Sequence, residues 1–435
     1  MRRRFRGRMT ATQGQAWPVA ARLVARWLDR RERIDLLLDT LPDSLAGVER
    51  ARCQNLVLGA VRHFGRLDAA LARLVAHRPR FLTRAVLLVA GYELIEGAAA
   101  EDDGRTAKIV HHAVEQAKSI ASPAEARLVN AVVRKLAGAL ATQVPPADEA
   151  EKLAEFFSHP AWLVRGWLAQ FGLEATRALL AWNQRPAPVH ARWRAAGEAI
   201  PSWLEPTSWA GYFEVKPGHW PEVEELLRAG KLYLQDPSTR LPVELLAPQA
   251  GEMVLDLCAA PGGKSLAIAD AMGDGRLVAV DVPGARIDRL KENLARSGRV
   301  DVALVQADVL ADLGAIFREH GLPDAYAAVL IDVPCSNTGV MRHRVDVKWR
   351  LQPGDLKKHP QQQLAMLAAA ARRVAPGGRL VYSTCSIEAE ENEDVVRRFL
   401  ASRGGAGFAL ERTAASHPWT AGHDGGAAFR LRRAS

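Results

Sequence analysis

Residues 253–265 read M-V-L-D-L-C-A-A-P-G-G-K-S, and this stretch decides the expected fold of the C-terminal half of the chain. Its apolar start, Met253 to Leu257, is typical of a strand buried in a parallel sheet, and the Pro-Gly-Gly sequence at 261–263 interrupts that strand. A helical pattern begins at Lys264. A strand, a glycine turn and a helix N-terminus together direct backbone N–H groups toward a ligand. The stretch therefore predicts a binding loop at the carboxyl end of a strand, beside the carboxylate of Asp256.

The neighbouring residues indicate which ligand this loop binds. The G-K-S sequence at 263–265 would complete a phosphate-binding G-x-x-x-x-G-K-[ST] loop, but Cys258 stands where that pattern has its first glycine. The next apolar run, 276–282, carries Asp281 about 20 residues beyond the glycines, a position suited to hydrogen bonds with ribose hydroxyls. We therefore predict a nucleoside cofactor with no phosphate, and a structural glycine turn followed by a solvated strand-end aspartate remains the alternative.

Composition and charge restrict the class of protein. The chain has 435 residues, enough for two or three domains, and 48% of them are hydrophobic, which excludes a disordered protein. Apolar runs stay shorter than the ~18 residues of a membrane span. The basic start at 2–8 lacks the apolar stretch of a signal peptide, so we expect a cytoplasmic protein with no membrane partner. A formal net charge of +9 favours an anionic partner, most commonly nucleic acid.

The first third of the chain has helical periodicity. After a basic tail at 1–15, residues 16–141 repeat apolar side chains at three- and four-residue steps. Three segments, L-V-L-G-A-V-R at 56–62, A-V-L-L-V-A-G-Y-E-L at 85–94 and V-N-A-V-V-R-K at 129–135, resemble the NusB-type RNA-binding helical bundle. The resemblance implies an RNA-binding domain, and a purely structural helical domain remains the alternative.

Residues 142–230 are expected to link this bundle to the rest of the chain. Pro145 and Pro146 mark a linker, and helices carrying Trp162 and Trp167 follow it. Prolines and short alternating pieces between 186 and 234 then predict a small α+β module. Its tryptophans are interpreted as core residues rather than base-stacking platforms, and its role stays open.

From residue 231 to 435, apolar runs alternate with helix-patterned segments. The runs are Val254–Leu257, Leu277–Val280, Val302–Val305, Ala327–Ile331 and Leu380–Val381. This alternation predicts an α/β fold class, a doubly wound, Rossmann-like parallel sheet. Ligands in such sheets contact the residues that end the strands, which here are Asp281, Asp308, Asp332 and Cys385.

Two of the four cysteines are expected to face one another. Cys335 follows the fourth strand and Cys385 the fifth, and no C-x-x-C pair suggests zinc or a disulfide framework. Helical sequence begins soon after Cys385, so a helix N-terminus and nearby basic residues would favour its thiolate. We predict a cysteine nucleophile and no metal, and two small buried hydrophobic residues remain the alternative.

Several motifs together resemble the S-adenosylmethionine-dependent RNA cytosine-C5 methyltransferases. They are D-L-C-A-A-P-G-G-K-S at 256–265, V-D-V at 280–282, Q-A-D at 306–308, D-V-P-C-S-N-T-G-V at 332–340 and Y-S-T-C-S-I-E-A-E-E-N-E at 382–393. The NusB-like first third points within that family to the Sun/Fmu type, which modifies 16S ribosomal RNA. Asn337 stands where the family commonly has glycine and Val333 where alanine is common, so the base pocket could differ in detail.

The resemblance assigns roles to individual residues. It implies that S-adenosyl-L-methionine is bound by Cys258, Ala259, Ala260, Pro261, Gly262, Gly263, Lys264, Asp281 and Asp308. The loop would hold the methionine end, Asp281 the ribose and Asp308 the adenine edge. Asp332 would lie between cofactor and base. Cys385 would be the nucleophile, and Cys335 would assist product release.

The chemistry of cytosine explains the need for a thiolate. Its C5 atom is a poor nucleophile, and addition of sulfur at C6 converts the ring into an enamine whose C5 can take a methyl group. The base must leave any stack, so the partner is single-stranded or flipped RNA, expected to be 16S ribosomal RNA, free or in an early small-subunit particle. We expect the enzyme to act as a monomer.

The basic segment that follows Cys335 is a candidate RNA contact. The sequence M-R-H-R-V-D-V-K-W-R at 341–350 offers Arg342, Arg344, Lys348, Trp349 and Arg350 for phosphates and a stacked base. A solvated basic loop is the alternative.

Three other functions stay open. One is methylation of another RNA such as tRNA. Another is a P-loop NTPase, in which Lys264 and Ser265 would serve phosphate and magnesium and Asp332 would be the acid. The last is a non-catalytic RNA assembly factor, which the bundle and the basic charge suggest.

Overall fold

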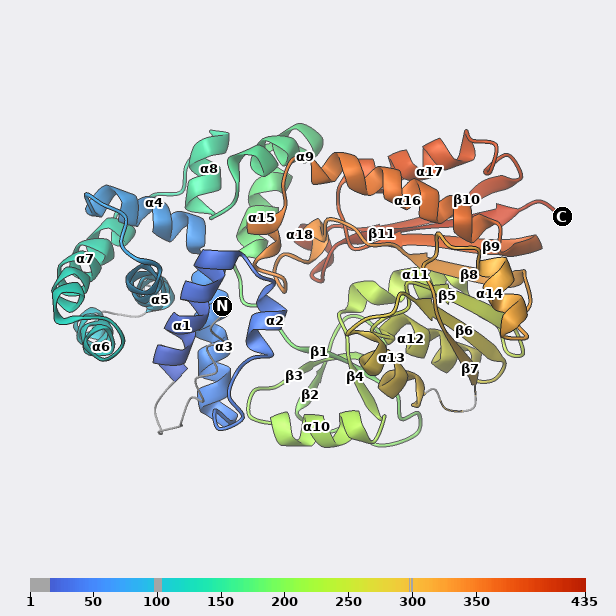
Figure 1. The fold of residues 1–435 in the computed structure, drawn as a ribbon, viewed down its shortest axis with the longest axis horizontal. Coiled ribbons are helices and arrows are strands. Elements are labelled where there is room, and N and C mark those ends of the chain that lie inside the picture. Colours follow the sequence, from blue (N-terminus) through green and yellow to red (C-terminus); the bar gives the residue numbers. More distant parts are fainter. Residues whose placement is uncertain (1–15, 98–103, 297, 299) are drawn as a thin grey trace, which may run out of the picture. The chain divides into compact units, whose positions relative to one another are not determined.

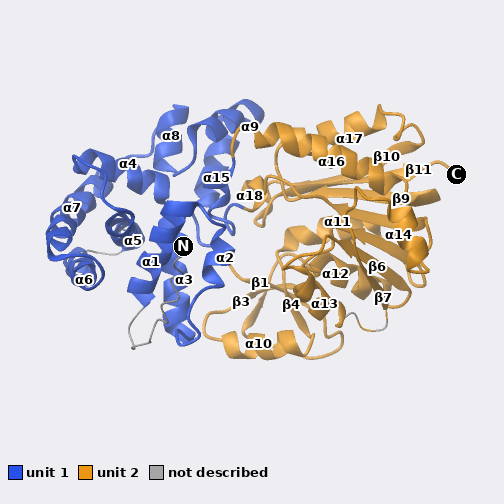
Figure 2. Ribbon diagram, viewed as in Figure 1, with its two compact units in different colours: residues 1–186, 341–351 blue, residues 187–340, 352–435 orange. Residues whose placement is uncertain are grey.

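The structure is a computed structural model that describes residues 16–97, 104–296, 298 and 300–435. The basic tail expected at 1–15 lies outside the described residues. The chain forms two compact units, one made of residues 1–186 and 341–351 and the other of residues 187–340 and 352–435 (Figure 2). Each unit is described by itself below.

The first unit is all-helical. Its helices are α1 (Ala16–Arg30), α2 (Ile34–Leu38), α3 (Gly47–Arg62), α4 (Phe64–Leu74), α5 (Phe81–Gly97), α6 (Arg105–Ile120), α7 (Pro123–Ala141), α8 (Ala150–Phe156), α9 (Ala161–Asn183) and α15 (Val347–Arg350). Helix α5 is mostly apolar and lies at the centre of the bundle, where Ala85 through Ala90 are fully buried. Helix α7 begins at Pro123 after Ser122, whose hydroxyl caps the N–H of Glu125. The predicted helical bundle is confirmed.

The segment that was expected to be one linker and module, 142–230, is divided between the two units at residue 186. Helices α8 and α9 pack on each other in the first unit. The second unit begins with an antiparallel sheet of order β2-β3-β1-β4 and helix α10. Their bounds are β1 (His190–Trp193), β2 (Leu204–Pro206), β3 (Tyr212–Val215), α10 (Trp220–Arg228) and β4 (Leu232–Leu234).

A seven-stranded sheet of order β10-β11-β9-β8-β5-β6-β7 forms the rest of the second unit (Figure 1). Its strands are β5 (Met253–Leu257), β6 (Arg276–Asp281), β7 (Asp301–Gln306), β8 (Tyr326–Asp332), β9 (Val374–Thr384), β10 (Phe408–Ser416) and β11 (Gly426–Arg433). Strands β5 to β9 are parallel, whereas β10 and β11 pair antiparallel with each other and with β9. The α/β fold class is confirmed, with an antiparallel edge added to the predicted parallel sheet.

Helices cover both faces of this sheet. The helical segments of this part of the chain, with η marking a 3-10 helix, are η1 (Pro237–Thr239), α11 (Arg240–Leu246), α12 (Gly263–Met272), α13 (Ile287–Leu294), α14 (Leu313–Glu319), η2 (Thr338–Val340), α16 (Asp355–Ala371), η3 (Ala389–Glu391), α17 (Glu393–Leu400) and α18 (Pro418–Ala421). Successive residues of β5 point to opposite faces, so Leu255 packs with α14, α16 and α17, and Val254 packs with α11 and α12. Two-sided burial explains why the strands read as continuous apolar runs. No helix within the described ranges is long and apolar enough to span a bilayer.

Candidate active site

Three neighbouring strands bring polar residues to one edge of the large sheet. Strands β5, β8 and β9 pair in parallel, so their carboxyl ends lie side by side. Lys264, in the first turn of α12, donates through Nζ to Oδ2 of Asp332 at the end of β8, at 2.8 Å. Ser383 of β9 donates through Oγ to Oδ1 of the same carboxylate, at 2.7 Å. Donors from two other elements therefore fix the orientation of Asp332.

The two cysteines that follow β8 and β9 lie next to each other. Sγ of Cys335 is 3.3 Å from Sγ of Cys385, so the proximity expected from the sequence is found. Sγ of Cys385 is also 3.3 Å from Oδ1 of Asn337. Both thiols are partly exposed. One edge of the sheet thus brings two thiols within hydrogen-bond distance of each other.

The surroundings of this site shift the pKa values of Cys335 and Lys264. The hydrogen bond to Cys385, together with burial, raises the pKa of Cys335 well above its ordinary value. Burial acts to lower the pKa of Lys264, but the ion pair with Asp332 outweighs burial, and the interaction with Cys385 adds to the rise. Lys264 therefore stays charged beside Cys385, and Cys335 holds its proton more strongly than an ordinary cysteine does.

Asn337 has a backbone conformation that explains its departure from the family pattern. Its φ angle is +61°, in the left-handed region that glycine adopts freely and asparagine tolerates better than other residues. Its side-chain Nδ2 donates to the carbonyl of Cys335 at 2.7 Å. Asparagine therefore satisfies the backbone requirement of this turn and adds an amide that contacts both cysteine residues.

The loop between β5 and α12 is held by two neighbouring elements. The N–H of Ala260 donates to Oδ2 of Asp281 at the end of β6, at 2.8 Å. Asn293 of α13 donates through Nδ2 to the carbonyl of Pro261, at 2.7 Å. The positions predicted to bind the cofactor, 258–264, are thereby brought together with Asp281 and Asp332.

Carboxylates surround this loop. Asp256 is 1% exposed, and its Oδ2 accepts a hydrogen bond from Oγ of Ser265 at 2.5 Å, whereas its Oδ1 has no hydrogen-bond partner among the described residues. Burial raises the pKa of Asp256 to about 7. Burial also raises the pKa of the Cys258 thiol, and the charges of Asp281, Asp332 and Asp256 raise it further. This set fits a cofactor that joins positive charge to a nucleoside, as S-adenosyl-L-methionine does.

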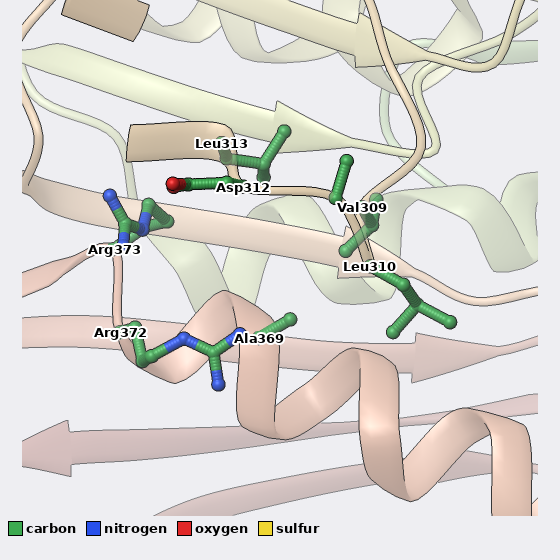
Figure 3. Close-up of a pocket in the computed structure, with 8 residues that line it drawn as sticks. Val309, Leu310, Asp312, Leu313, Ala369, Arg372 and Arg373 are labelled. Atoms are coloured by element: carbon green, nitrogen blue, oxygen red, sulfur yellow. The ribbon is translucent and has the colours of Figure 1, made fainter. Parts of the chain in front are cut away.

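Asp308 lies at the carboxyl end of β7, the strand next to β6. Its Oδ1 accepts the N–H of Leu310 at 2.9 Å, and the side chain is exposed. The loop that follows lines a pocket of about 290 Å³ together with the end of α16 (Figure 3). Its lining includes neither cysteine and no residue of 258–264, so this pocket is separate from the site at the strand ends.

The basic segment after β8 is placed differently from the expectation. Residues 341–351 belong to the first unit. Lys348 is 1% exposed and donates through Nζ to the carbonyl of Arg62, at 3.0 Å. The indole N–H of Trp349 donates to the carbonyl of Val61, at 2.9 Å. Lys348 is therefore buried in the helical unit instead of being exposed for a phosphate, whereas stacking of the half-buried Trp349 on a base stays a prediction.

The three arginines of this segment differ in their surroundings. Arg342 donates to the carbonyl of Pro186 at 3.0 and 2.7 Å, and Arg350 donates to Oδ2 of Asp346 at 3.1 Å. Arg344 is exposed. Contact with RNA by these arginines stays a prediction.

Sequence reasoning missed the residues that support the reacting groups. Ser383 and Asn337 contact Asp332 and Cys385, and neither was expected to do so. Glu391 is fully buried beside Cys335, but it is one of four glutamates within 388–393, and the sequence does not distinguish it from its neighbours. Only the order of motifs on neighbouring strands could have indicated these contacts.

The chain is similar to known methyltransferases along most of its length. Residues 243–427 match the family described as 16S rRNA methyltransferase RsmB/F, and residues 15–138 match the NusB family. Ribosomal RNA small subunit methyltransferase B of Sodalis glossinidius is 32% identical over 410 residues, which cover 88% of each chain. The protein of the same name from Yersinia enterocolitica is 30% identical and covers 88% of this chain and 89% of its own.

A solved structure supports the fold. The crystal structure of PH0851 matches with a TM-score of 0.75 and 22% identity, covering 98% of this chain and 100% of that one. At this identity the likeness concerns the fold alone. Together with the sequence relatives and the strand-end site, these findings show that the chain belongs to the RsmB/F family of S-adenosylmethionine-dependent ribosomal RNA methyltransferases.

Proposed function

We propose that the protein methylates C5 of a cytosine in 16S ribosomal RNA through a covalent adduct between Cys385 and C6 of the base. The observation that carries this proposal is the 3.3 Å separation of the sulfur atoms of Cys335 and Cys385 beside Asp332. The curated relatives named above are small-subunit ribosomal RNA methyltransferases, which supports 16S RNA as the substrate.

The loop 258–264 holds the methionine end of S-adenosyl-L-methionine, Asp281 the ribose hydroxyls and Asp308 the adenine edge. Backbone N–H groups at the start of α12 and the carboxylates around Cys258 suit these roles. When bound, the cofactor supplies an electrophilic methyl group on its sulfonium.

Cys385 begins the reaction. Its thiolate adds to C6 of cytosine, so a C6–S bond forms and the electron pair of the C5–C6 double bond makes C5 nucleophilic toward the methyl group. Asp332, fixed by Lys264 and Ser383, accepts a hydrogen bond from the N4 amino group of the ring, and the ammonium of Lys264 stabilises the negative charge that develops toward N3. The alternative P-loop function is disfavoured, because Lys264 is engaged by Asp332.

Release reverses the addition. The C5 proton passes to water, the C5–H electron pair forms the C5–C6 double bond, and the C6–S bond breaks with its pair on Sγ of Cys385. The thiol of Cys335 is kept protonated and donates a hydrogen bond to the departing sulfur, which lowers the barrier to this step.

The helical unit supplies RNA contacts outside the reacting base, in keeping with its match to the NusB family. The target cytosine is unstacked when it reaches the thiols. No step requires a second copy of the chain, and we propose a monomer.

Two substitutions test the reaction. With S-adenosyl-L-methionine and 16S RNA, Cys385→Ala should abolish methylation, and Cys335→Ala should accumulate a protein–RNA adduct that survives denaturing electrophoresis. Cys53→Ala, in the core of the helical unit, is the matched control and should form no lasting adduct. Methylation by Cys385→Ala at the parental rate would overturn the proposal and favour another nucleophile. The same assay with tRNA separates the two classes of substrate.

A further inference from the structure

Glu391, in η3, is a fully buried carboxylate whose partners lie on two other parts of the second unit, the loop after β8 and helix α16. Its Oε1 accepts the backbone N–H of Ser336 at 2.9 Å, Nε2 of Gln363 at 2.9 Å and Nδ1 of His359 at 3.1 Å. The hydroxyl of Ser336 donates to Oε2. Burial acts to raise the pKa of Glu391, but these hydrogen bonds outweigh burial and lower it, so the group is ionised.

These contacts hold both neighbours of Cys335. Glu391 accepts the N–H of Ser336 on one side, and Nε2 of Gln363, which also donates to Glu391, donates to the carbonyl of Pro334 on the other side, at 3.0 Å. Pro334 and Ser336 flank the thiol directly. Charge-assisted hydrogen bonds of this kind are about twice as strong as neutral ones.

Asn392, the next residue in the chain, holds both neighbours of Cys385. Its Oδ1 accepts the hydroxyl of Thr384 at 2.7 Å, and its Nδ2 donates to the carbonyl of Ser386 at 3.0 Å. Asn392 is 3% exposed. Two adjacent residues therefore hold the two short loops that carry the two thiols.

We infer that Glu391 and Asn392 form a positioning pair that sets the geometry of the two thiols, Glu391 for Cys335 and Asn392 for Cys385. The inference rests on the proposed function. Its physical basis is that a backbone shift of about 1 Å at a catalytic group can cost two orders of magnitude in rate. Because the two residues are consecutive in the chain, a shift of the backbone at either cysteine relative to the other strains one of these hydrogen-bond sets.

The pair predicts two different kinetic defects. Glu391→Gln replaces one acceptor oxygen by an NH₂ group that faces donors, so the Pro334–Ser336 loop loses its fixed position and Cys335 no longer meets the departing sulfur. The variant should therefore accumulate the covalent RNA adduct although both thiols are present, and its multiple-turnover rate should fall at least about tenfold while the first turnover persists.

Asn392→Asp should act on the earlier step. It removes the donor to the carbonyl of Ser386, which displaces Cys385 and slows formation of the adduct itself. Single-turnover methyl transfer should fall about tenfold without adduct accumulation. A purely structural role would instead lower both steps together with the melting temperature.

Glu390→Gln is the matched control, because Glu390 is the exposed neighbour of Glu391. It should behave as the parent. Where Glu391→Gln fails to fold, Gln363→Met keeps the test decisive, since it removes the donor to Pro334 with little change of volume and should also accumulate adduct.

The outcomes separate this inference from the proposed function. Accumulation of the covalent protein–RNA adduct by both the Cys335→Ala and the Glu391→Gln variants supports the proposed function and the positioning role. Adduct with Cys335→Ala, together with parental turnover by folded Glu391→Gln or Gln363→Met, overturns the positioning role alone. No adduct with Cys335→Ala overturns the proposed function itself.

Discussion

Nζ of Lys264 and Oδ2 of Asp332 lie 2.8 Å apart, although 68 positions separate them in the sequence. Lys264 extends the binding loop between β5 and α12, and Asp332 ends β8 beside the two thiols. The pair therefore connects the part of the site that suits the cofactor with the part that suits the base. A change in either residue is expected to affect both functions.

Lys264→Met should lower kcat about 100-fold, a loss typical of removing one group that stabilises charge in a transition state. The substitution keeps the length of the side chain but removes the charge that orients Asp332 and favours the Cys385 thiolate. Steady-state methylation of 16S RNA, with separate titrations of RNA and methyl donor, measures the effect. Lys291→Met, on the exposed side of α13, is the control and should keep the parental kcat. An unchanged kcat in Lys264→Met would remove the lysine from the mechanism.

Lys348→Met should leave the affinity for RNA and its salt dependence unchanged. Each lysine that contacts a phosphate contributes about one unit to the slope of log affinity against log salt, and the buried ammonium of Lys348 contacts the carbonyl of Arg62 instead. Burial and the charge of Arg62 lower the pKa of Lys348 well below its ordinary value, so an apolar side chain of similar length is tolerated there.

Filter binding at several salt concentrations checks this expectation. Arg344→Met provides the comparison, because Arg344 is exposed in the same segment. A shallower salt slope in Lys348→Met than in the parent would show that the lysine leaves its buried position to bind RNA.

The strands of the large sheet and their order of motifs could be predicted because local patterns encode them. Met253, Val254, Leu255 and Leu257 give strand β5 apolar side chains on both faces, and the glycines that follow require a turn. Strand β10 was missed because it is an edge strand whose residues are mostly exposed, so its sequence lacks that pattern. Local patterning therefore predicts elements with two buried faces best.

Contacts between distant segments could not be predicted in the same way. Lys348 is 286 positions from Arg62, and a run of basic residues resembles a solvated or RNA-binding loop until the partner segment is known. Val345 and Val347 are buried in the structure. In the sequence V-D-V-K-W at 345–349 they alternate with charged residues, so two buried valines could not be recognised there. The pairing of the two cysteines was predictable because both end neighbouring strands, which fixes their distance through the sheet.

Asp256→Asn should stabilise the protein at pH 8 and have little effect at pH 4. Burial raises the pKa of Asp256 from its ordinary value of 3.8 to about 7, so the folded state binds a proton that the unfolded state has released between these two values. The stability contributed by the protonated group is present below about pH 4 and is lost as the pH rises toward 7.

The side chain of Asn at position 256 does not titrate, so the Asp256→Asn variant keeps the stability of the uncharged group at every pH. The difference in free energy of unfolding between variant and parent should therefore grow from pH 4 to pH 7 by up to about 4 kcal/mol, at 1.36 kcal/mol per pKa unit, and stay constant above pH 7. Urea unfolding of the cofactor-free protein at five pH values measures it, with Asp288→Asn on the exposed side of α13 as the control that should show no such trend. A difference that is constant between pH 4 and pH 7 would mean that Asp256 is ionised throughout, and its unpaired Oδ1 would then need a cationic partner from outside the chain.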